Sequence, residues 1–491
     1  MSDEAAAPQG PRGEELRQAR LRKLERLRER GLDPYPYAFA GITPIGDVRT
    51  QFSELAAGED TELRFRLAGR VAAQRGQGKS AFLDLVDRSG RFQLHARADV
   101  LDEPDFELVG ALDLGDLIGV EGPVFRSRRG ELSLLVESVT VLAKSLRPLP
   151  DKHHGLADVE TRLRHRELDL IADPAVRERF VTRARAIAAI RRFLDERGFV
   201  EVETPVLQPV YGGAAARPFT TYYNALDRTF YLRIATELYL KRCIVGGLER
   251  VYELGKDFRN EGLSPKHNPE FTMLEFYEAY ADYHDVAAAL EQMVSYVAEQ
   301  VGDAGGEIDF SPPWPRETLR DAITTRTGID IVANRERDAL AAAMTARGLA
   351  VDEQDSWAGL VDELVSKHVE PTLIRPTFLF DYPVELSPFA KAHRSEPGLV
   401  ERFEAFCNGI EIANAFSELN DPIEQRARLA SQRAAAADDE AQPYDEAFLE
   451  ALEYGMPPTG GLGLGIDRLV MILTGQRTIR EVILFPALRD P

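Results

Sequence analysis

The spacing of hydrophobic positions divides the first third of the chain into a charged helix and a series of short strands. In residues 14–31, leucines recur on one narrow stripe among Arg and Lys side chains, which predicts an amphipathic helix that ends at Gly31. Between residues 62 and 145, five short β-prone runs alternate with glycine-containing turns. This pattern predicts a small closed or partly closed barrel of the OB type.

The remaining two thirds predict an α+β domain. Residues 146–165 combine Pro, Gly and polar side chains and are expected to form a linker. From 166 to 491, helical and β-rich stretches follow one another without a βαβ repeat, which indicates a mainly antiparallel sheet flanked by helices. Residues 286–370 are Ala-rich and are expected to form a helical insertion, and residues 1–61 hold the N-terminal helix and a lead-in.

Composition narrows the class of protein. The 491 residues are 44% hydrophobic and 29% charged, as in a globular chain, and two cysteines, Cys243 and Cys407, exclude a disulfide framework and a Cys-rich zinc module. No apolar run approaches the roughly 20 residues of a membrane helix. The acidic N-terminus lacks the basic-then-apolar order of a signal peptide. We therefore expect a cytoplasmic protein without a membrane partner.

The net charge of −21 argues at first against a nucleic-acid partner. Residues 1–150, however, hold 22 basic and 24 acidic side chains, against 38 and 57 in residues 151–491. Residues 11–30 alone hold eight basic and four acidic side chains. The N-terminal third can therefore present a local basic surface, and its first helix either caps the next domain or contacts RNA.

Two glycine-rich stretches are similar to nucleotide loops only in part. Residues 73–80, AQRGQGKS, have Ala73 where a Walker A loop needs glycine and lack its buried strand and long helix, which favours a hairpin turn. The run Gly461 to Gly465 has no βαβ context, which argues against a Rossmann site. Because it leads into a helix that carries Arg468, we expect it to let the backbone approach a ligand.

Residues 249–280 carry the most distinctive chemistry. Two β runs flank the loop GLSPKHNP, and period-2 alternation places Arg259 and Glu261 on one face of the first strand. One face of the second strand holds Phe271, Met273, Glu275 and Tyr277. With His267 from the loop, these side chains predict a concave surface of mixed charge, and a surface hairpin with salt bridges is the alternative.

Three ordered motifs resemble those of class II aminoacyl-tRNA synthetases. FRNE, a short loop and HNPEFTMLEFY resemble motif 2, GFVEVETPVL with Pro205 resembles motif 1 at the dimer interface, and GLGLGIDRL resembles motif 3. The linking stretches RPLPDKHHGLADVETRLRHRELDLI, YGGAAARPF, RIATELYLKR, NAFSELND and ILFPALR are similar to bacterial-type class II lysyl-tRNA synthetases. The resemblance spans about residues 20 to 489 and implies a homodimer, with an anticodon-binding OB barrel and a class II catalytic domain.

This resemblance implies ATP-dependent ligation of L-lysine to tRNA(Lys) through a lysyl-adenylate, with release of AMP and diphosphate. It implies that Arg259 holds the α-phosphate and the lysine carboxylate, and that Phe271 stacks on adenine. Arg468 would lie on the other face of adenine and reach the γ-phosphate. Further ATP-binding residues are His267, Glu261 and Asn268. Displacement at phosphorus needs in-line positioning and neutralised oxygens, which forked guanidinium groups supply.

The resemblance also implies anions at both ends of the lysine substrate. Glu237 would bind the α-ammonium, with the backbone of Gly213 nearby. The implied set around the rest of the substrate is Glu275, Tyr277 and Glu418 at the ε-ammonium, Phe416 at the methylene stem, and Asn414. Thr236 departs from the family pattern, in which proline commonly precedes this first glutamate.

A second hairpin predicts a metal site. The dipeptide Asn408-Gly409 is a strong hairpin signal that places Glu411 opposite Phe406, with Glu404 on the same face. Two such carboxylates can bridge Mg²⁺, and the resemblance implies two or three Mg²⁺ ions beside the ATP phosphates. Strict alternation puts the lysine-binding residues that follow on the opposite face. If the predicted metal ligands and these lysine-binding residues line one site, the strand needs a β-bulge or a sharp twist near residues 412–413.

For the barrel, the resemblance implies that Phe82 stacks on the central anticodon uridine. Its implied hydrogen-bonding companions are Arg70, Gln93 and Glu131. OB barrels read single-stranded bases by aromatic stacking and polar edges. Taken alone, Phe82 fits an ordinary barrel-core aromatic residue.

Two alternative functions remain open. A paralogue that lysylates a protein should lack the barrel at 62–145. A non-catalytic RNA-binding relative should have lost Arg259, Arg468, Glu404 or Glu411, and the chain retains all four.

Overall fold

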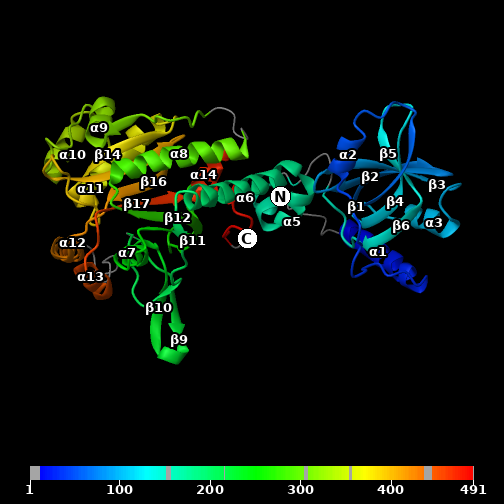
Figure 1. Cartoon of the computed structure of the whole chain (residues 1–491), viewed down its shortest axis with the longest axis horizontal. Helices are drawn as coiled ribbons and strands as arrows, with labels where there is room; N and C mark the ends of the chain where they lie inside the picture. Colours follow the sequence, from blue (N-terminus) through cyan, green and yellow to red (C-terminus); the bar gives the residue numbers. More distant parts are fainter. Residues whose placement is uncertain are drawn as a thin grey trace. The chain divides into compact units, whose positions relative to one another are not determined.

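The structure is a computed structural model that describes residues 11–150, 156, 158–214, 216–302, 308–352, 356–435 and 445–489. It divides the chain into two compact units, the barrel unit (Met1–Ala172) and the sheet unit (Asp173–Pro491) (Figure 1). Parts of the predicted N-terminal segment (1–10), linker (151–155 and 157) and insertion (303–307 and 353–355) lie outside the described residues. Among the described residues, no helix has the length and apolar character needed to cross a membrane.

The barrel unit confirms the predicted OB fold. Its six strands follow the order β1-β2-β3-β5-β4-β6, and β1 also pairs with β4. The last predicted run is divided into β5 and β6 at Glu137. The elements are α1 (Pro11–Glu29), α2 (Ile45–Gln51), β1 (Asp60–Gln77), β2 (Ser80–Asp87), β3 (Gly90–Arg97), α3 (Glu103–Ala111), β4 (Leu117–Arg126), β5 (Leu132–Val136), β6 (Ser138–Ala143), α4 (Val159–Arg164) and α5 (Arg166–Ala172).

The barrel unit tests two predictions from the sequence, one for residues 73–80 and one for the N-terminal helix. The segment AQRGQGKS forms the hairpin between β1 and β2, as expected, with Gln77 paired to Ser80. The helix α1 packs on the barrel, because buried Arg20 donates to the carbonyl oxygens of Leu114 and Ser145 at 3.1 and 2.9 Å. Lys23 donates to Asp113 at 2.7 Å. The helix therefore caps the barrel, which was one of its two expected roles.

The sheet unit is built on an eight-stranded sheet of order β13-β14-β15-β16-β17-β12-β11-β7. Only the outer pairs β13–β14 and β11–β7 are parallel, which confirms the mainly antiparallel prediction. Its strands are β7 (Val200–Glu201), β8 (Leu207–Gln208), β9 (Thr220–Tyr223), β10 (Arg228–Leu232), β11 (Arg250–Phe258), β12 (Glu270–Ala279), β13 (Arg316–Thr318), β14 (Thr377–Pro383), β15 (Leu399–Cys407), β16 (Ile410–Ser417) and β17 (Thr459–Gly465).

Helices and short helical segments surround this sheet. The helices are α6 (Pro174–Asp195), α7 (Glu237–Val245), α8 (Tyr283–Val301), α9 (Leu319–Thr327), α10 (Arg337–Thr345), α11 (Trp357–Leu364), α12 (Pro422–Ala435), α13 (Glu446–Glu453) and α14 (Ile466–Leu473). The short segments are η1 (Asn224–Leu226), η2 (Val365–Val369), η3 (Glu370–Thr372), η4 (Val384–Leu386) and η5 (Ile479–Glu481).

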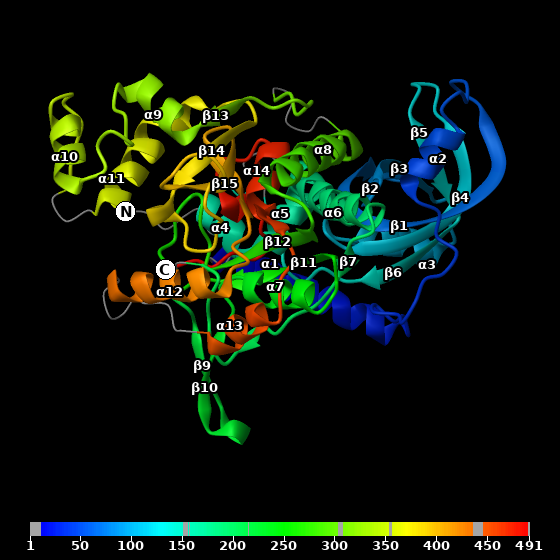
Figure 2. The same ribbon diagram turned by 60° about the vertical axis from the view of Figure 1, so that its left-hand side comes forward.

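One face of the sheet is covered by helices and forms the main core. Residues of α6, α8 and α14 pack against alternate residues of the strands, such as Leu274 and Phe276 on β12. The views of Figures 1 and 2 both show α6 and α8 side by side in this layer. Because alternate residues point to opposite faces, Glu275 and Tyr277 are left for the uncovered face.

The structure divides the segment expected to be a helical insertion. The helix α8 begins at Tyr283 and belongs to the layer that covers the sheet. The helices α9, α10 and α11 instead form a separate hydrophobic cluster with β14 and β15, in which Leu319, Leu340 and Leu360 are fully buried. Ala-rich helical periodicity alone cannot separate these two environments, because both bury one apolar face.

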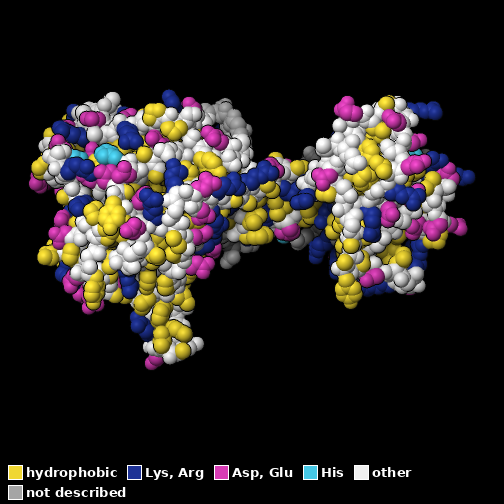
Figure 3. Space-filling view, in the orientation of Figure 1, with side chains coloured by type: hydrophobic (Ala, Val, Ile, Leu, Met, Phe, Trp, Pro, Cys, Tyr) yellow, Lys and Arg dark blue, Asp and Glu magenta, His cyan; other side chains and the backbone are white. Residues whose placement is uncertain are grey.

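A two-stranded hairpin, β9–β10, projects from the sheet unit in both ribbon views (Figures 1 and 2). Its tip carries the exposed side chains of Tyr222, Tyr223 and Leu226. Figure 3 shows hydrophobic side chains along this hairpin.

Candidate active site

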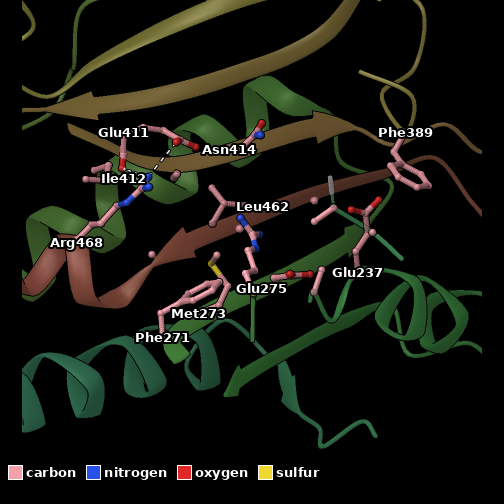
Figure 4. Close-up of a pocket in the computed structure, with 18 of the residues that line it drawn as sticks. Glu237, Phe271, Met273, Glu275, Phe389, Glu411, Ile412, Asn414, Leu462 and Arg468 are labelled. Carbon is pink, nitrogen blue, oxygen red and sulfur yellow. Dashed lines mark hydrogen bonds and ion pairs between the residues drawn. The ribbon is translucent and has the colours of Figure 1, made fainter. Parts of the chain in front are cut away.

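A cavity of about 510 Å³ lies on the face of the sheet that the helices leave open. Its floor is formed by β12, β16 and β17, and its walls by the loop after β11, the start of α7 and the segment around Phe389. Figure 4 shows Phe271, Glu411 and Arg468 at one end and Glu237 and Phe389 at the other. The cavity therefore has room for an extended ligand with two chemically different ends.

The β12 strand supplies the residues that its alternation predicts. Phe271, Met273, Glu275 and Tyr277 all line the cavity. The first strand of this hairpin differs from the prediction, because β11 ends at Phe258, which pairs with Glu270. Arg259 and Glu261 follow in the loop, where the Arg259 amide still donates to the Pro269 carbonyl at 2.9 Å. Both residues line the cavity from the loop rather than from a strand face.

The second hairpin contains the irregularity that the sequence required. Phe406 pairs with Glu411, as expected from the Asn408-Gly409 turn, but Ala405 pairs with Ala413. Ile412 is therefore the extra residue of a β-bulge. Beyond the bulge the alternation is reversed, so Glu411 and the residues Asn414, Phe416 and Glu418 line the same cavity.

The glycine run forms the central strand of the floor. Gly461 pairs with Tyr277, and a Cβ atom at Gly461 would collide with the Tyr277 ring and with Glu418 Oε1. Gly463 pairs with Glu275 in the same way. Glycine is needed at Gly461 because any side chain would occupy the space of two cavity residues. The groups that come close to Gly461 are side chains of the protein, and the approach of a ligand to this run stays a prediction.

Cationic and aromatic groups gather at the first end of the cavity. Arg468, on the first turn of α14, donates to Glu411 Oε2 at 3.0 Å and to its carbonyl at 2.8 Å. Its other amine lies 3.1 Å from His267 Nε2, and His267 Nδ1 lies 2.8 Å from the Ser264 hydroxyl. Partial desolvation and the Arg468 guanidinium lower the pKa of His267. Because a guanidinium can only donate hydrogen bonds, Nε2 of His267 is the acceptor in its contact with Arg468.

Arg259 and Phe271 form the opposite side of this end. The Arg259 guanidinium lies 5.1 Å from the centroid of the Phe271 ring, and Nε donates to the Ile234 carbonyl at 3.5 Å. Asn268 is buried and donates to the Glu270 carbonyl at 2.6 Å, while its Oδ1 has no hydrogen-bond partner among the described residues. Glu261 is exposed at the rim. Guanidinium forks on two sides of a cavity are suited to binding phosphate oxygens.

Carboxylates dominate the second end. Glu237, Glu275 and Glu418 are buried, and Tyr277 donates to Glu275 at 3.2 Å. Burial raises the pKa of Glu275, and the neighbouring carboxylates of Asp257 and Glu237 add to this rise. Gly213 has φ +88°, and its missing Cβ leaves Glu237 room beside it. This end of the cavity lacks enough positive charge, so it is suited to a cationic ligand.

Thr236 stands at the position where proline was expected from the resemblance, and it makes a hydrogen bond that proline could not make. Its backbone amide donates to Glu275 Oε1 at 3.3 Å. Proline has no amide proton and could not make this bond. The hydrogen bond lowers the pKa of Glu275, against the effect of burial.

The sequence interpretation missed two residues of the site. Lys241 is fully buried between Glu237 and Glu418, with ion pairs of 2.5 Å to each. Arg402 lines the cavity, donates to Asn414 Oδ1 at 3.1 Å and forms an ion pair with Glu404. A glutamate and a lysine four residues apart usually form a surface pair on a helix. The available signal for Lys241 was its spacing of three residues from both Leu238 and Ile244, which places it on the apolar face of α7.

The two predicted metal ligands lie in different environments. Glu411 lines the cavity, whereas Glu404 lies behind it and accepts hydrogen bonds from Arg402 and, at 2.9 Å, from Tyr382. Burial and the neighbouring Glu411 carboxylate together raise the pKa of Glu404 to about 7, although the Arg402 guanidinium lowers it. No group of three or more His, Cys, Asp or Glu side chains among the described residues is arranged to hold a metal ion.

Three of the four predicted anticodon residues lie on the outer surface of the barrel. Phe82 pairs with His95 across β2 and β3, and their rings stack at 4.3 Å with an interplanar angle of 9°. Phe82 points away from the core, which excludes the core-aromatic alternative. Gln93 accepts a hydrogen bond from Ser133 at 3.0 Å, and Glu131 is exposed in the turn before β5. Arg70 lies farther along the sheet and donates to the Gly115 carbonyl at 2.7 Å.

Comparison with known proteins agrees with this geometry. The family model of class II tRNA synthetases (D, K and N) matches residues 158–489, and that of an OB-fold nucleic acid binding domain matches residues 65–142. A lysine–tRNA ligase of Dehalococcoides mccartyi is 52% identical, with 97% of this chain and 98% of the relative covered. A lysine–tRNA ligase of Roseiflexus castenholzii is 53% identical, with coverage of 97% and 99%. The chain is therefore an enzyme that belongs to the class II tRNA synthetases, in the lysine–tRNA ligase family.

Proposed function

We propose that this enzyme ligates L-lysine to tRNA(Lys) in two steps, with a lysyl-adenylate as the intermediate. The choice of lysine as the substrate rests on one observation. Glu237, Glu275 and Glu418 lie buried at one end of the cavity, and two arginines, Arg259 and Arg468, line its other end. A cation without a partner is costly to bury, so this end favours a ligand that brings positive charge. An aspartate side chain would add a further negative charge to the same end.

In the first step, a lysine carboxylate oxygen attacks the α-phosphorus of ATP. The bond from that phosphorus to the β-phosphate oxygen breaks, and diphosphate leaves. Arg259 would hold the α-phosphate and the lysine carboxylate together, Phe271 would stack on adenine, and Arg468 with His267 would hold the γ-phosphate. Glu261 and Asn268 complete the proposed ATP set. Positioning and charge neutralisation are the main requirements of such a displacement.

Mg²⁺ fits this arrangement as a partner of the nucleotide. Glu411 and Glu404 offer hard oxygen ligands, but two carboxylates are too few for a complete site. Mg²⁺ usually completes its coordination with phosphate oxygens and water. We assign Glu404 and Glu411 as its protein ligands, and the ion would neutralise charge on the triphosphate. Arg468, now paired with Glu411, would then be free to bind phosphate.

In the second step, a hydroxyl of the 3′-terminal ribose attacks the lysyl carbonyl carbon, and AMP leaves. The barrel supports tRNA as the acceptor, because its outer surface presents the Phe82 and His95 rings beside Gln93. A protein-lysylating paralogue would have no use for this surface. The same proposal includes a homodimer through the region of Pro205, whose neighbours Val206 and Leu207 are exposed apolar residues, and a location in the cytoplasm.

Amino-acid-dependent exchange between ATP and pyrophosphate tests the proposed substrate directly. We expect lysine alone, from a panel of the standard amino acids, to support exchange by the purified full chain. Exchange supported by aspartate or asparagine instead would contradict the proposal that Glu237, Glu275 and Glu418 bind the ammonium groups of lysine. Exchange with lysine but no charging of tRNA(Lys) would favour a paralogue that acts on another acceptor.

The barrel surface gives a second prediction. Replacing Phe82 by alanine should lower kcat/KM for tRNA(Lys) about 10- to 100-fold, because a base–aromatic stack contributes about 1–3 kcal/mol. Lysine-dependent ATP–pyrophosphate exchange does not involve the anticodon and should stay unchanged. Leu63→Ala removes an exposed apolar side chain from the same unit and is the control. An equal loss of exchange in F82A would show a folding defect and would contradict an anticodon role.

A further inference from the structure

Lys241 is the buried cation of the lysine end of the cavity. It lies one turn after Glu237 on α7 and is 0% exposed, with its Nζ 2.5 Å from Glu237 Oε1 and 2.5 Å from Glu418 Oε2. The Phe389 ring covers the ammonium, with its centroid 5.0 Å from Nζ. Glu237, Glu418 and Phe389 belong to the described lining of the cavity, and Lys241 does not. The ammonium therefore contacts these residues from behind.

Each of the two carboxylates gives one oxygen to Lys241 and turns the other toward the cavity. Glu237 Oε2 faces Gly213, 3.7 Å from the position that a Cβ atom would take there. Neither Glu418 oxygen has a hydrogen-bond partner among the described residues; Oε2 forms the ion pair with Lys241, and Oε1, which faces Gly461 and the Tyr277 ring, has no charged partner in that part of the chain. Because Glu418 is 2% exposed, this oxygen is a buried acceptor that needs a donor from a ligand.

The charge of these carboxylates depends on Lys241. Burial raises the pKa of Glu418 and the Glu237 carboxylate adds to this rise, whereas the Lys241 ammonium, 2.5 Å away, lowers it. The titratable groups that face this ion cluster are Glu237 on α7, Glu275 and Tyr277 on β12, and Glu418 after β16. Without Lys241, proton uptake would be the simplest way to relieve the repulsion among three buried carboxylates.

We propose that Lys241 is a positioning residue for substrate selection, which holds Glu237 and Glu418 oriented and charged before lysine binds. The substrate cations then bind the two oxygens that Lys241 leaves free. This inference rests on the proposed function, because it assigns these oxygens to the ammonium groups of lysine. It also explains how an empty pocket of buried carboxylates retains the negative charge that it offers to the substrate.

Lys241→Met tests the proposal because methionine keeps much of the stem and removes the charge. The KM for lysine in ATP–pyrophosphate exchange should rise about 10- to 100-fold near neutral pH, with little change in the KM for ATP. Carboxylates with a raised pKa become charged only as the pH rises, so the KM of the variant should fall at least about tenfold from about pH 6.5 to about pH 8.5. The wild type should change less over this range.

Two further variants complete the experiment. Lys367→Met removes a lysine that also pairs with a glutamate four residues earlier, but on the surface, and should behave as the wild type. Lys241→Gln keeps hydrogen-bond donors without charge, and should show the same pH dependence if the methionine variant does not fold. A lysine KM and pH profile equal to the wild type in either folded Lys241 variant would overturn the proposal. Absence of lysine-dependent exchange in the wild type would instead overturn the proposed function.

Discussion

Replacing Arg259 by methionine should lower kcat/KM for lysine-dependent ATP–pyrophosphate exchange about a thousandfold, or about 4 kcal/mol of transition-state stabilisation. Arg259 lines the cavity beside Phe271, and we propose that its guanidinium binds both the α-phosphate and the lysine carboxylate. Two anions that approach each other repel, and a forked guanidinium neutralises both while fixing their geometry. Initial exchange rates over a range of ATP and lysine concentrations measure the loss.

Arg320→Met is the matched control for this variant. Arg320, on α9, forms a surface ion pair with Asp330 and does not line the cavity, so its loss should change the exchange rate little. Circular dichroism of both variants should match that of the wild type. A folded R259M variant that retains more than about a tenth of the wild-type kcat/KM would contradict the role proposed for Arg259.

Local patterns in the sequence predicted much of the site because β-strands alternate with a strict period of two. Phe271, Met273, Glu275 and Tyr277 follow this period and all reach the cavity. The same strictness made the bulge at Ile412 predictable, because Glu411 and Asn414 could share one face only if a residue was inserted between them. In the second hairpin, the turn signal and the period together determined the register, whereas in the first hairpin β11 ends at Phe258, before the predicted strand positions of Arg259 and Glu261.

The parts that could not be predicted depend on contacts between distant segments. Lys241 is buried because Glu418, far along the chain, and Phe389 enclose it, and no local pattern on α7 reports either neighbour. The placement of Arg402 between Asn414 and Glu404 likewise depends on how β15 and β16 twist around the bulge. Buried ion pairs are therefore the features that a pattern-based interpretation is least able to find.

Replacing Glu418 by glutamine should lower kcat/KM for lysine about 100- to 1,000-fold, mainly through the KM for lysine. The amide has the shape of the carboxylate but no charge, so both Lys241 and the proposed ε-ammonium would lose a buried anionic partner. Losing one partner of a buried charge pair costs about 2–5 kcal/mol, much of it from the charge left unpaired. Exchange measured with lysine and with norleucine, its uncharged analogue, should show the preference for lysine reduced by a similar factor.

Glu446→Gln is the control for this last prediction, because Glu446 pairs with Arg426 on the exposed side of α13. The double variant Lys241→Met/Glu418→Gln then separates direct from indirect loss. If Lys241 acts through Glu418, the double variant should lose less than the product of the two single losses, because the second change removes a charge that the first left unpaired. An unchanged lysine KM in folded E418Q would show that this carboxylate does not bind the substrate, since a buried anion in contact with an ammonium cannot be neutralised without effect.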